Sequence, residues 1–306
     1  MTRAESNILL FSITLCWAAS YVFIGSLPPD LSAFAYITLT TGIAAIILSV
    51  VFFKRLRKVN LSTIKSAFLL SIFLMGGLVL EKMGIELIPA SNASFLASLS
   101  ILIVPGLMLL LKKKPTKNNV AGAGIILLGL LLASRFSLNA FANTGTGFML
   151  AACFFSSVYI ISADRFTKES DPLLIGVVQM IFTAVFGFVF WTIEEPATFM
   201  SIAYTNEMLS SIFILAFFSK AYAYIVLMFS QKYSDPINVT VIASTEPIIT
   251  LMLAVMIPAA YGAGEAFTLA SLGGALVIAF GAVIAGTNFM SRKKPNEPNK
   301  GELPCL

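Results

Sequence analysis

The sequence predicts an all-α membrane protein with ten transmembrane helices, arranged as two inverted five-helix repeats with both termini in the cytoplasm. Three observations predict this fold class: the composition, the spacing of long apolar segments and the placement of the basic residues. The 306 residues are 58% hydrophobic and 11% charged, with a mean hydropathy of +0.91. Since about a quarter of the residues in a soluble domain are charged, the composition indicates a membrane protein.

The apolar segments have the length of membrane-spanning helices, which need about 20 mostly apolar residues. Short polar or proline-containing loops separate them, and none of these loops has room for a soluble domain. The first segment contains Trp17 and Tyr21 and lacks a small-x-small cleavage site, so we interpret it as a retained helix. The expected helices cover residues 7–25, 31–53, 64–87, 90–111, 119–136, 145–163, 172–192, 208–232, 235–257 and 268–289.

The basic residues occupy alternate loops. With both termini on one side of the membrane, that side carries all of the 20 basic residues except Lys82, Arg135 and Lys220. By the positive-inside rule this side is the cytoplasm, and we expect the bacterial inner membrane as the location. The polar tail, residues 291–306, is expected to be disordered and cytoplasmic.

Matching patterns in the two halves indicate an internal repeat. Trp17–Phe23 and Phe155–Ile161 both place an aromatic residue, small residues and a tyrosine in one register, at an offset of 138. Pro105 and Pro247 are paired at an offset of 142. At an offset of 152, two glycines seven residues apart recur: Gly122 and Gly129, then Gly274 and Gly281.

A repeat of five helices has a direct consequence for topology. Because five is an odd number, the two halves enter the membrane from opposite sides, as in many secondary transporters with one central site. We expect the first repeat to cover residues 1–136 and the second to cover residues 145–290.

Several motifs resemble the drug/metabolite transporter superfamily, specifically its EamA-domain family. In the first half they are Gly84–Leu96 and Val104-Pro105, and in the second half Ser234–Pro236 and Thr245–Pro247, together with the glycines of the last helix. The resemblance implies a ten-helix exporter-type fold, with a solute cavity lined by helices 1, 3, 4, 6, 8 and 9. It names no single substrate, because the family spans amino acids, sugars, other metabolites and drugs.

Three charged residues stand out within the apolar segments: Glu81, Lys220 and Glu246. Each costs about 2.5–3.5 kcal/mol on insertion scales, so such residues usually face a cavity or a partner. Lys220 precedes the turn between helices 8 and 9 by about as many residues as Glu246 follows it, which gives both a similar depth at 1.5 Å rise per residue. We therefore expect these two side chains to face each other.

Two interpretations of this pair stay open. One is a structural ion pair between helices 8 and 9. The other assigns a substrate carboxylate or phosphate to Lys220, and a substrate amine or a coupling proton to Glu246, since burial favours the protonated carboxyl group. Both hold if substrate displaces one partner. Glu81 is a candidate proton site, or alternatively a carboxylate that reaches the lipid headgroups.

Further polar residues are candidates for the cavity wall, or for hydrogen bonds between helices. These are Tyr21, Thr38, Tyr159, Gln179, Tyr222 and Tyr224. Trp17 is either a packing residue or a stacking platform for solute. We expect the glycines to allow close helix contacts, namely Gly76, Gly77, Gly122, Gly129, Gly274 and Gly281.

The function expected from these residues is secondary transport, in the direction of export, of a small zwitterionic or anionic metabolite such as an amino acid. Alternating access is the expected mechanism, and protons are the candidate coupling ion. The chain has no His and no G-x-x-x-x-G-K-[ST] motif, so we expect no enzyme activity, metal, cofactor, ATP or nucleic-acid partner. The alternatives are a cation or drug exporter using Glu81 and Glu246, and a non-transporting membrane scaffold.

Overall fold

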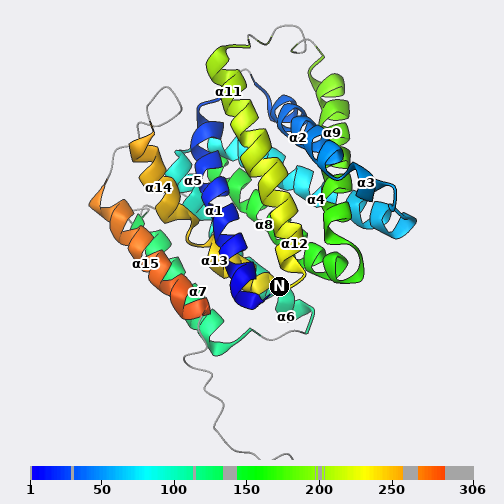
Figure 1. Cartoon of the computed structure of the whole chain (residues 1–306). Helices are drawn as coiled ribbons and strands as arrows, with labels where there is room; N and C mark the ends of the chain where they lie inside the picture. Colours follow the sequence, from blue (N-terminus) through cyan, green and yellow to red (C-terminus); the bar gives the residue numbers. More distant parts are fainter. Residues whose placement is uncertain are drawn as a thin grey trace, which may run out of the picture.

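The computed structural model describes residues 2–28, 31–112, 115–133, 143–196, 198, 202, 204–257 and 268–286. Helices make up this part of the chain, and no strand occurs within it (Figure 1). The tail expected at residues 291–306 lies outside the described residues. The all-helical class expected from the composition is confirmed.

Each of the ten apolar segments contains helix, and the bounds follow the sequence closely. The elements are α1 (Arg3–Gly25), α2 (Ala33–Val51), α3 (Phe53–Leu56), α4 (Leu61–Ile85), α5 (Ala90–Ala97), α6 (Ser100–Leu110), α7 (Lys117–Ala133), α8 (Thr144–Glu169), α9 (Pro172–Glu194), α11 (Asn206–Ile214), the π-helix η2 (Leu215–Tyr222), α12 (Ala223–Gln231), α13 (Pro236–Ala243), α14 (Glu246–Met256) and α15 (Leu269–Gly286).

Eight helical segments of the described chain are long and apolar enough to cross a membrane. Three of them combine consecutive elements, since α5 continues into α6, α11 through η2 into α12, and α13 into α14. The two remaining segments are the shorter apolar helices Lys117–Ala133 and Leu269–Ala285. Together these helices define a multi-pass membrane protein.

Polar residues in the loops determine where the helices begin. Asn60 accepts a hydrogen bond from the backbone N–H of Thr63 at 2.8 Å and caps α4. Asp235 caps α13 through the N–H of Asn238 at 2.9 Å, and Pro236 occupies the first turn. Such caps satisfy N–H groups that have no partner inside the helix. The Ser234-Asp235-Pro236 motif therefore starts a helix rather than only interrupting one.

The glycines of α7 and α15 lie in an antiparallel helix contact. A Cβ atom on Gly122 would lie 2.5 Å from the carbonyl oxygen of Gly281, and one on Gly274 would lie 2.6 Å from that of Gly129. A Cβ atom on Gly76 would likewise lie 2.6 Å from the ring of Phe155. The expected role of these glycines in close helix contacts is confirmed.

Equivalent helices of the two halves make equivalent contacts with the other half. The first helix of each half packs on the third helix of the other, so that α1 lies against η2 and α12 while α8 lies against α4. The second helices, α2 and α9, pack on each other, as do the last ones, α7 and α15. In Figure 1, α7 and α15 form a separate pair at one side of the remaining helices.

Two equivalent helices are interrupted at the same place. A two-residue turn, Ser98-Leu99, divides α5 from α6, and Ser244-Thr245 divides α13 from α14. The flanking helices have 8 and 11 residues in both halves. These bounds relate the halves at an offset of 146 rather than 142. Pro105 and Pro247, which were expected to be equivalent, therefore lie one helical turn apart in the repeat.

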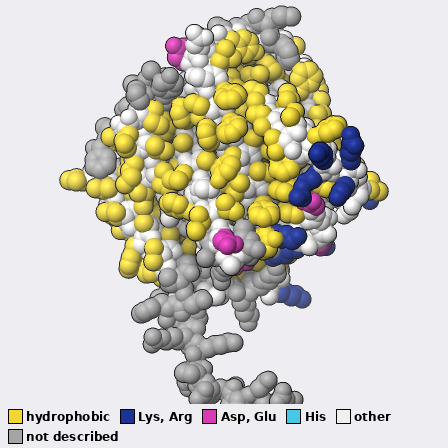
Figure 2. Space-filling model, viewed as in Figure 1, with side chains coloured by type: hydrophobic (Ala, Val, Ile, Leu, Met, Phe, Trp, Pro, Cys, Tyr) yellow, Lys and Arg dark blue, Asp and Glu magenta, His cyan; other side chains and the backbone are white. Residues whose placement is uncertain are grey.

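The outer surface is apolar, as a bilayer requires. Hydrophobic side chains cover most of the face in Figure 2, and Lys and Arg side chains gather beside α3. Arg55 forms a salt bridge with Asp171 at 3.1 Å and thereby joins the α3 end of the chain to the start of α9. The loop after α2 and the loop after α8 consequently lie at the same end of the helices, as the positions of the basic residues predicted.

Candidate solute-binding site

A cavity lies among the helices, and its empty space, including the part that is open to the outside, amounts to about 830 Å³. The centres of water-sized spheres can occupy about 100 Å³ of it, which is room for several water molecules. Its walls come from α1, α4, α8, the η2–α12 segment and the two interrupted helices. These are helices 1, 3, 4, 6, 8 and 9 of the sequence, as the resemblance implied.

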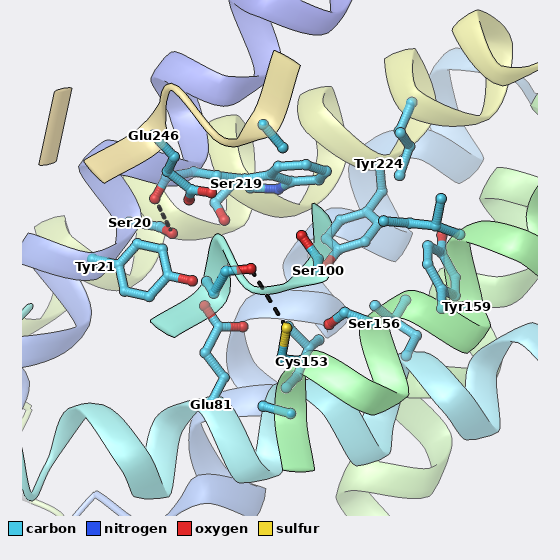
Figure 3. A pocket seen from close by; sticks show the side chains of 18 of the residues that line it. Ser20, Tyr21, Glu81, Ser100, Cys153, Ser156, Tyr159, Ser219, Tyr224 and Glu246 are labelled. Carbon is cyan, nitrogen blue, oxygen red and sulfur yellow. Dashed lines mark hydrogen bonds between the residues drawn. The ribbon is translucent and has the colours of Figure 1, made fainter. Parts of the chain in front are cut away.

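All three charged residues expected inside the membrane line this cavity. Lys220 and Glu246 are 2% and 7% exposed, and Glu81 is half-buried. In Figure 3, Glu81 and Glu246 come from different walls, with Tyr21 and Ser20 between them. One cation and two anions thus face a single buried space.

The expected contact between Lys220 and Glu246 is absent from the described part of the chain. Within it, no salt bridge of 4.0 Å or less joins Lys220 to an acidic residue. Lys220 shares the cavity wall with both acidic residues, Glu81 and Glu246. Similar depth along two helices does not make two side chains meet, because the direction in which each points depends on the helix rotation.

Aromatic rings surround the Lys220 ammonium group. Its Nζ atom lies 5.5 Å from the ring centre of Tyr36 and 5.8 Å from that of Tyr224. Cation–π contacts at this distance stabilise a charge that has left water. Trp17 and Tyr159 extend the aromatic wall on either side of Tyr224, with ring centres 5.7 and 5.9 Å away. Trp17 therefore both packs against this wall and lines the cavity.

Tyr21 and Tyr159, paired in the sequence repeat, both line the cavity. The Tyr21 hydroxyl points toward the Glu81 carboxylate (Figure 3) and interacts with it. The Tyr159 hydroxyl accepts a hydrogen bond from Nε2 of Gln179 at 2.9 Å. The two tyrosines consequently present their hydroxyl groups in different settings, one beside an acid and the other beside an amide.

Lys220 lies in the π-helix η2, which the sequence analysis did not foresee. The third helix of the second half, Asn206–Gln231, has 26 residues, whereas its counterpart α4 has 25. A π-turn holds one residue more than an α-turn, and this matches the difference in length. Single π-turns inside α-helices are frequent at functional sites. The insertion places both Ser219 and Lys220 on the cavity wall.

Three of the expected site residues lie elsewhere. Thr38 belongs to the contact between α2 and α9, where its Oγ1 would lie 2.9 Å from a Cβ atom on Gly187. Tyr222 forms a hydrogen bond of 2.8 Å with Ser12 between η2 and α1. Gln179 is fully buried behind Tyr159 and positions that ring. None of these three side chains lines the cavity.

Several cavity residues were missed by the sequence analysis. They are small polar side chains that membrane helices also use for packing, namely Ser20, Ser100, Cys153, Ser156 and Ser219. Ser20 and Ser156 belong to the two copies of the repeated motif, which was the only signal for this group. Tyr36 had no signal at all, since its proximity to Lys220 arises from the packing of α2 on η2.

The described residues contain no group of three or more His, Cys, Asp or Glu side chains that could hold a metal ion. What the wall offers is an ammonium group, two carboxyl groups, hydroxyls and aromatic faces. Such groups recognise complementary charges and apolar parts of a small molecule. Fold and site together define a multi-pass membrane protein with an internal polar cavity.

The chain belongs to the EamA-like transporter family, whose model matches residues 5–135 and 143–287. A crystal structure of a protein with 20% sequence identity has the same fold, with a TM-score of 0.71 over 96% of this chain and 100% of that one. No curated protein is significantly similar in sequence. The family is one of transporters, so a small-molecule substrate and a lipid bilayer are the partners that it implies.

Proposed function

We propose that this protein is a secondary transporter that exports a small zwitterionic or anionic metabolite, such as an amino acid, across the bacterial inner membrane. Ten membrane helices form two inverted repeats, residues 1–136 and 145–290, with both termini in the cytoplasm. Lys220 binds the carboxylate of the solute and Glu246 its amine. Glu81 takes up the coupling proton.

The observation that carries this proposal is the charge content of the cavity. Lys220, Glu81 and Glu246 line one buried space in a family of transporters, without a salt bridge of 4.0 Å or less to Lys220 among the described residues. Charges of this kind are costly inside a membrane, and they therefore usually mark a substrate or ion pathway. A zwitterionic solute carries a negative and a positive charge, so its binding would offset the cost of burying both Lys220 and the acidic residues.

The interrupted helices support alternating access. In carriers with inverted repeats, discontinuous helices at the centre of the membrane form the binding site and equivalent gates. Here the two interruptions, Ser98-Leu99 and Ser244-Thr245, are equivalent, and Ser100 and Glu246 line the cavity directly after them. Rocking of the two halves about this site would open it to one side at a time.

Transport in proteoliposomes tests the assignment. A thermal-shift screen against amino acids, amines and organic anions first identifies a ligand, because ligands of the folded state stabilise it. With that ligand, we expect Lys220→Ala and Glu246→Gln each to lower the transport rate at least about tenfold, since either change removes a charge contact worth 1.4 kcal/mol or more.

The matched controls are Lys65→Ala and Glu207→Gln, which change exposed side chains far from the cavity walls. Both should transport at the wild-type rate. Wild-type rates in Lys220→Ala and Glu246→Gln, with normal folding, would contradict the assigned site.

The cation or drug exporter is the second candidate, and one observation favours it. The cavity has two acids for one lysine, and its wall carries the aromatic rings of Trp17, Tyr159 and Tyr224. Aromatic faces and carboxylates together bind organic cations. In that case Glu81→Gln and Glu246→Gln abolish transport while Lys220→Ala retains it, so Lys220→Ala distinguishes this candidate from a zwitterion exporter.

A further inference from the structure

A second, apolar crevice lies beside the cavity, between α1 and the segment formed by α11 and η2. Its walls include Leu15, Cys16, Ala19 and Phe23 from α1, and Leu215 and Phe218 from η2. It has an empty volume of about 480 Å³ and contains no charged side chain. Its chemistry is therefore that of a hydrocarbon environment, unlike the charged cavity next to it.

The crevice and the cavity adjoin each other. Ser20 of α1 and Ser219 of η2 line both of them. The Ser219 side chain is 2% exposed, and its Oγ atom has no hydrogen-bond partner among the described residues. In Figure 3, Ser20 and Ser219 lie on the Glu246 side of the cavity. The wall shared by the two spaces therefore includes two small side chains on the side of the cavity where Glu246 lies.

The far end of the crevice reaches the outer surface of the helix bundle. Leu15 and Phe218 on its rim are 43% and 49% exposed. In a membrane-spanning chain, exposed apolar side chains at this depth face the lipid. The crevice thus lies between the lipid-facing surface and the charged cavity, and the small side chains of Ala19 and Ser20 leave space there.

We propose that the crevice is an apolar subsite of the solute site, which holds the unbranched alkyl side chain of a zwitterionic solute. The head group lies between Glu246 and Lys220, and the chain passes Ser20 and Ser219 to lie against Cys16 and Phe218. This inference rests on the proposed function and narrows its substrate class to amphiphilic amino acids.

The first test is a chain-length series. We would measure the binding of α-amino acids with unbranched side chains, from 2-aminobutanoate to 2-aminodecanoate, to the full-length protein in lipid nanodiscs. Each added methylene should tighten binding about fourfold until the crevice is full, since burial of one methylene contributes about 0.8 kcal/mol. Ala19→Leu fills the crevice and should remove this dependence while binding of 2-aminobutanoate persists.

Ala121→Leu is the matched control, because it enlarges a half-buried alanine of α7 that lines neither space. It should keep the wild-type slope with chain length. Should Ala19→Leu fail to fold, Cys16→Leu fills the same crevice from the next turn of α1. Equal affinities along the whole series in the wild-type protein overturn the inference.

The second test does not depend on the head group. A variant with Cys153→Ala and Cys305→Ser keeps Cys16 alone for reaction with N-ethylmaleimide or N-octylmaleimide. An octyl group tethered in the crevice should raise the thermal unfolding midpoint above that of the ethyl adduct, and Ala19→Leu should abolish this difference. Equal midpoints, as expected if a membrane lipid already fills the crevice, overturn the subsite.

The two tests separate the two proposals. If 2-aminobutanoate neither binds nor is transported, the zwitterion function fails, and the Cys16 adducts still decide whether the crevice takes an alkyl chain. If short amino acids bind but neither test shows an effect of chain length, the crevice inference fails and the transport proposal stands.

Discussion

Lysine residues inside the apolar helices of this protein have two different environments. Lys220 faces the cavity without a close acidic partner among the described residues, whereas Lys82 is fully buried and paired at 2.7 Å with Glu86, the C-cap residue of α4. A buried lysine that already has a partner is held in place, while one with aromatic neighbours and a more distant acid can exchange contacts with a solute. The first arrangement favours stability and the second favours binding.

The Lys82–Glu86 pair leads to a stability prediction. Glu86→Gln leaves a buried ammonium group with a weaker partner, and we expect it to lower the free energy of unfolding by about 1–3 kcal/mol. The measurement is the thermal unfolding midpoint of the purified protein in detergent.

The control for this prediction is the Arg165–Glu169 salt bridge, which has the same i,i+4 spacing but exposed side chains. Glu169→Gln should change the free energy of unfolding by less than about 0.5 kcal/mol. Similar midpoints for Glu86→Gln and Glu169→Gln would show that burial does not strengthen the pair.

The helices differ in whether they contribute side chains to the cavity wall. The interrupted helices and the π-helix bring Ser100, Glu246 and Lys220 to the cavity. The pair α7 and α15 lies outside the cavity wall and packs chiefly on itself and on the interrupted helices. We infer that the pair serves as a support, and that its glycines matter for stability rather than for solute binding.

Gly122 tests this role at the level of one helix. Gly122→Ala places a Cβ atom 2.5 Å from the backbone of Gly281, and we expect a loss of about 1–3 kcal/mol in the free energy of unfolding through overpacking. Gly124→Ala, two residues further on, meets no atom within 4 Å and should be neutral or slightly stabilising. Equal unfolding midpoints for the two variants would rule out close packing at Gly122.

At the scale of the whole molecule, the placement of basic residues predicts which side faces the cytoplasm. In a background without cysteines, we expect Glu207→Cys to react with a membrane-impermeant maleimide in intact cells, because it lies in the first turn of α11 on the predicted outer side. Lys58→Cys, in the loop before α4, should react only after the membrane is permeabilised. The reverse labelling pattern would invert the orientation.

Much of this architecture was accessible from the sequence because its causes are local or periodic. A helix that crosses a bilayer must be apolar over about 20 residues, so the segments around Lys220 and Glu246 could be marked directly. The offset of 152 between α7 and α15 was also readable, since close helix contacts leave glycines at fixed spacing. The pairing of Pro105 with Pro247 was wrong by one turn, because proline marks a helix without fixing where it bends.

The sequence by itself determined that the chain is an all-helical membrane protein of two similar halves, and that Glu81, Lys220 and Glu246 are charged residues within its apolar segments. Only the tertiary structure decided that Lys220 forms no close ion pair with Glu246 within the described residues, that Tyr36 lies beside Lys220, and that Thr38 faces another helix. The physical reason is that hydropathy fixes how deep a residue lies in the bilayer, whereas helix rotation, including the extra residue of η2, fixes what its side chain meets.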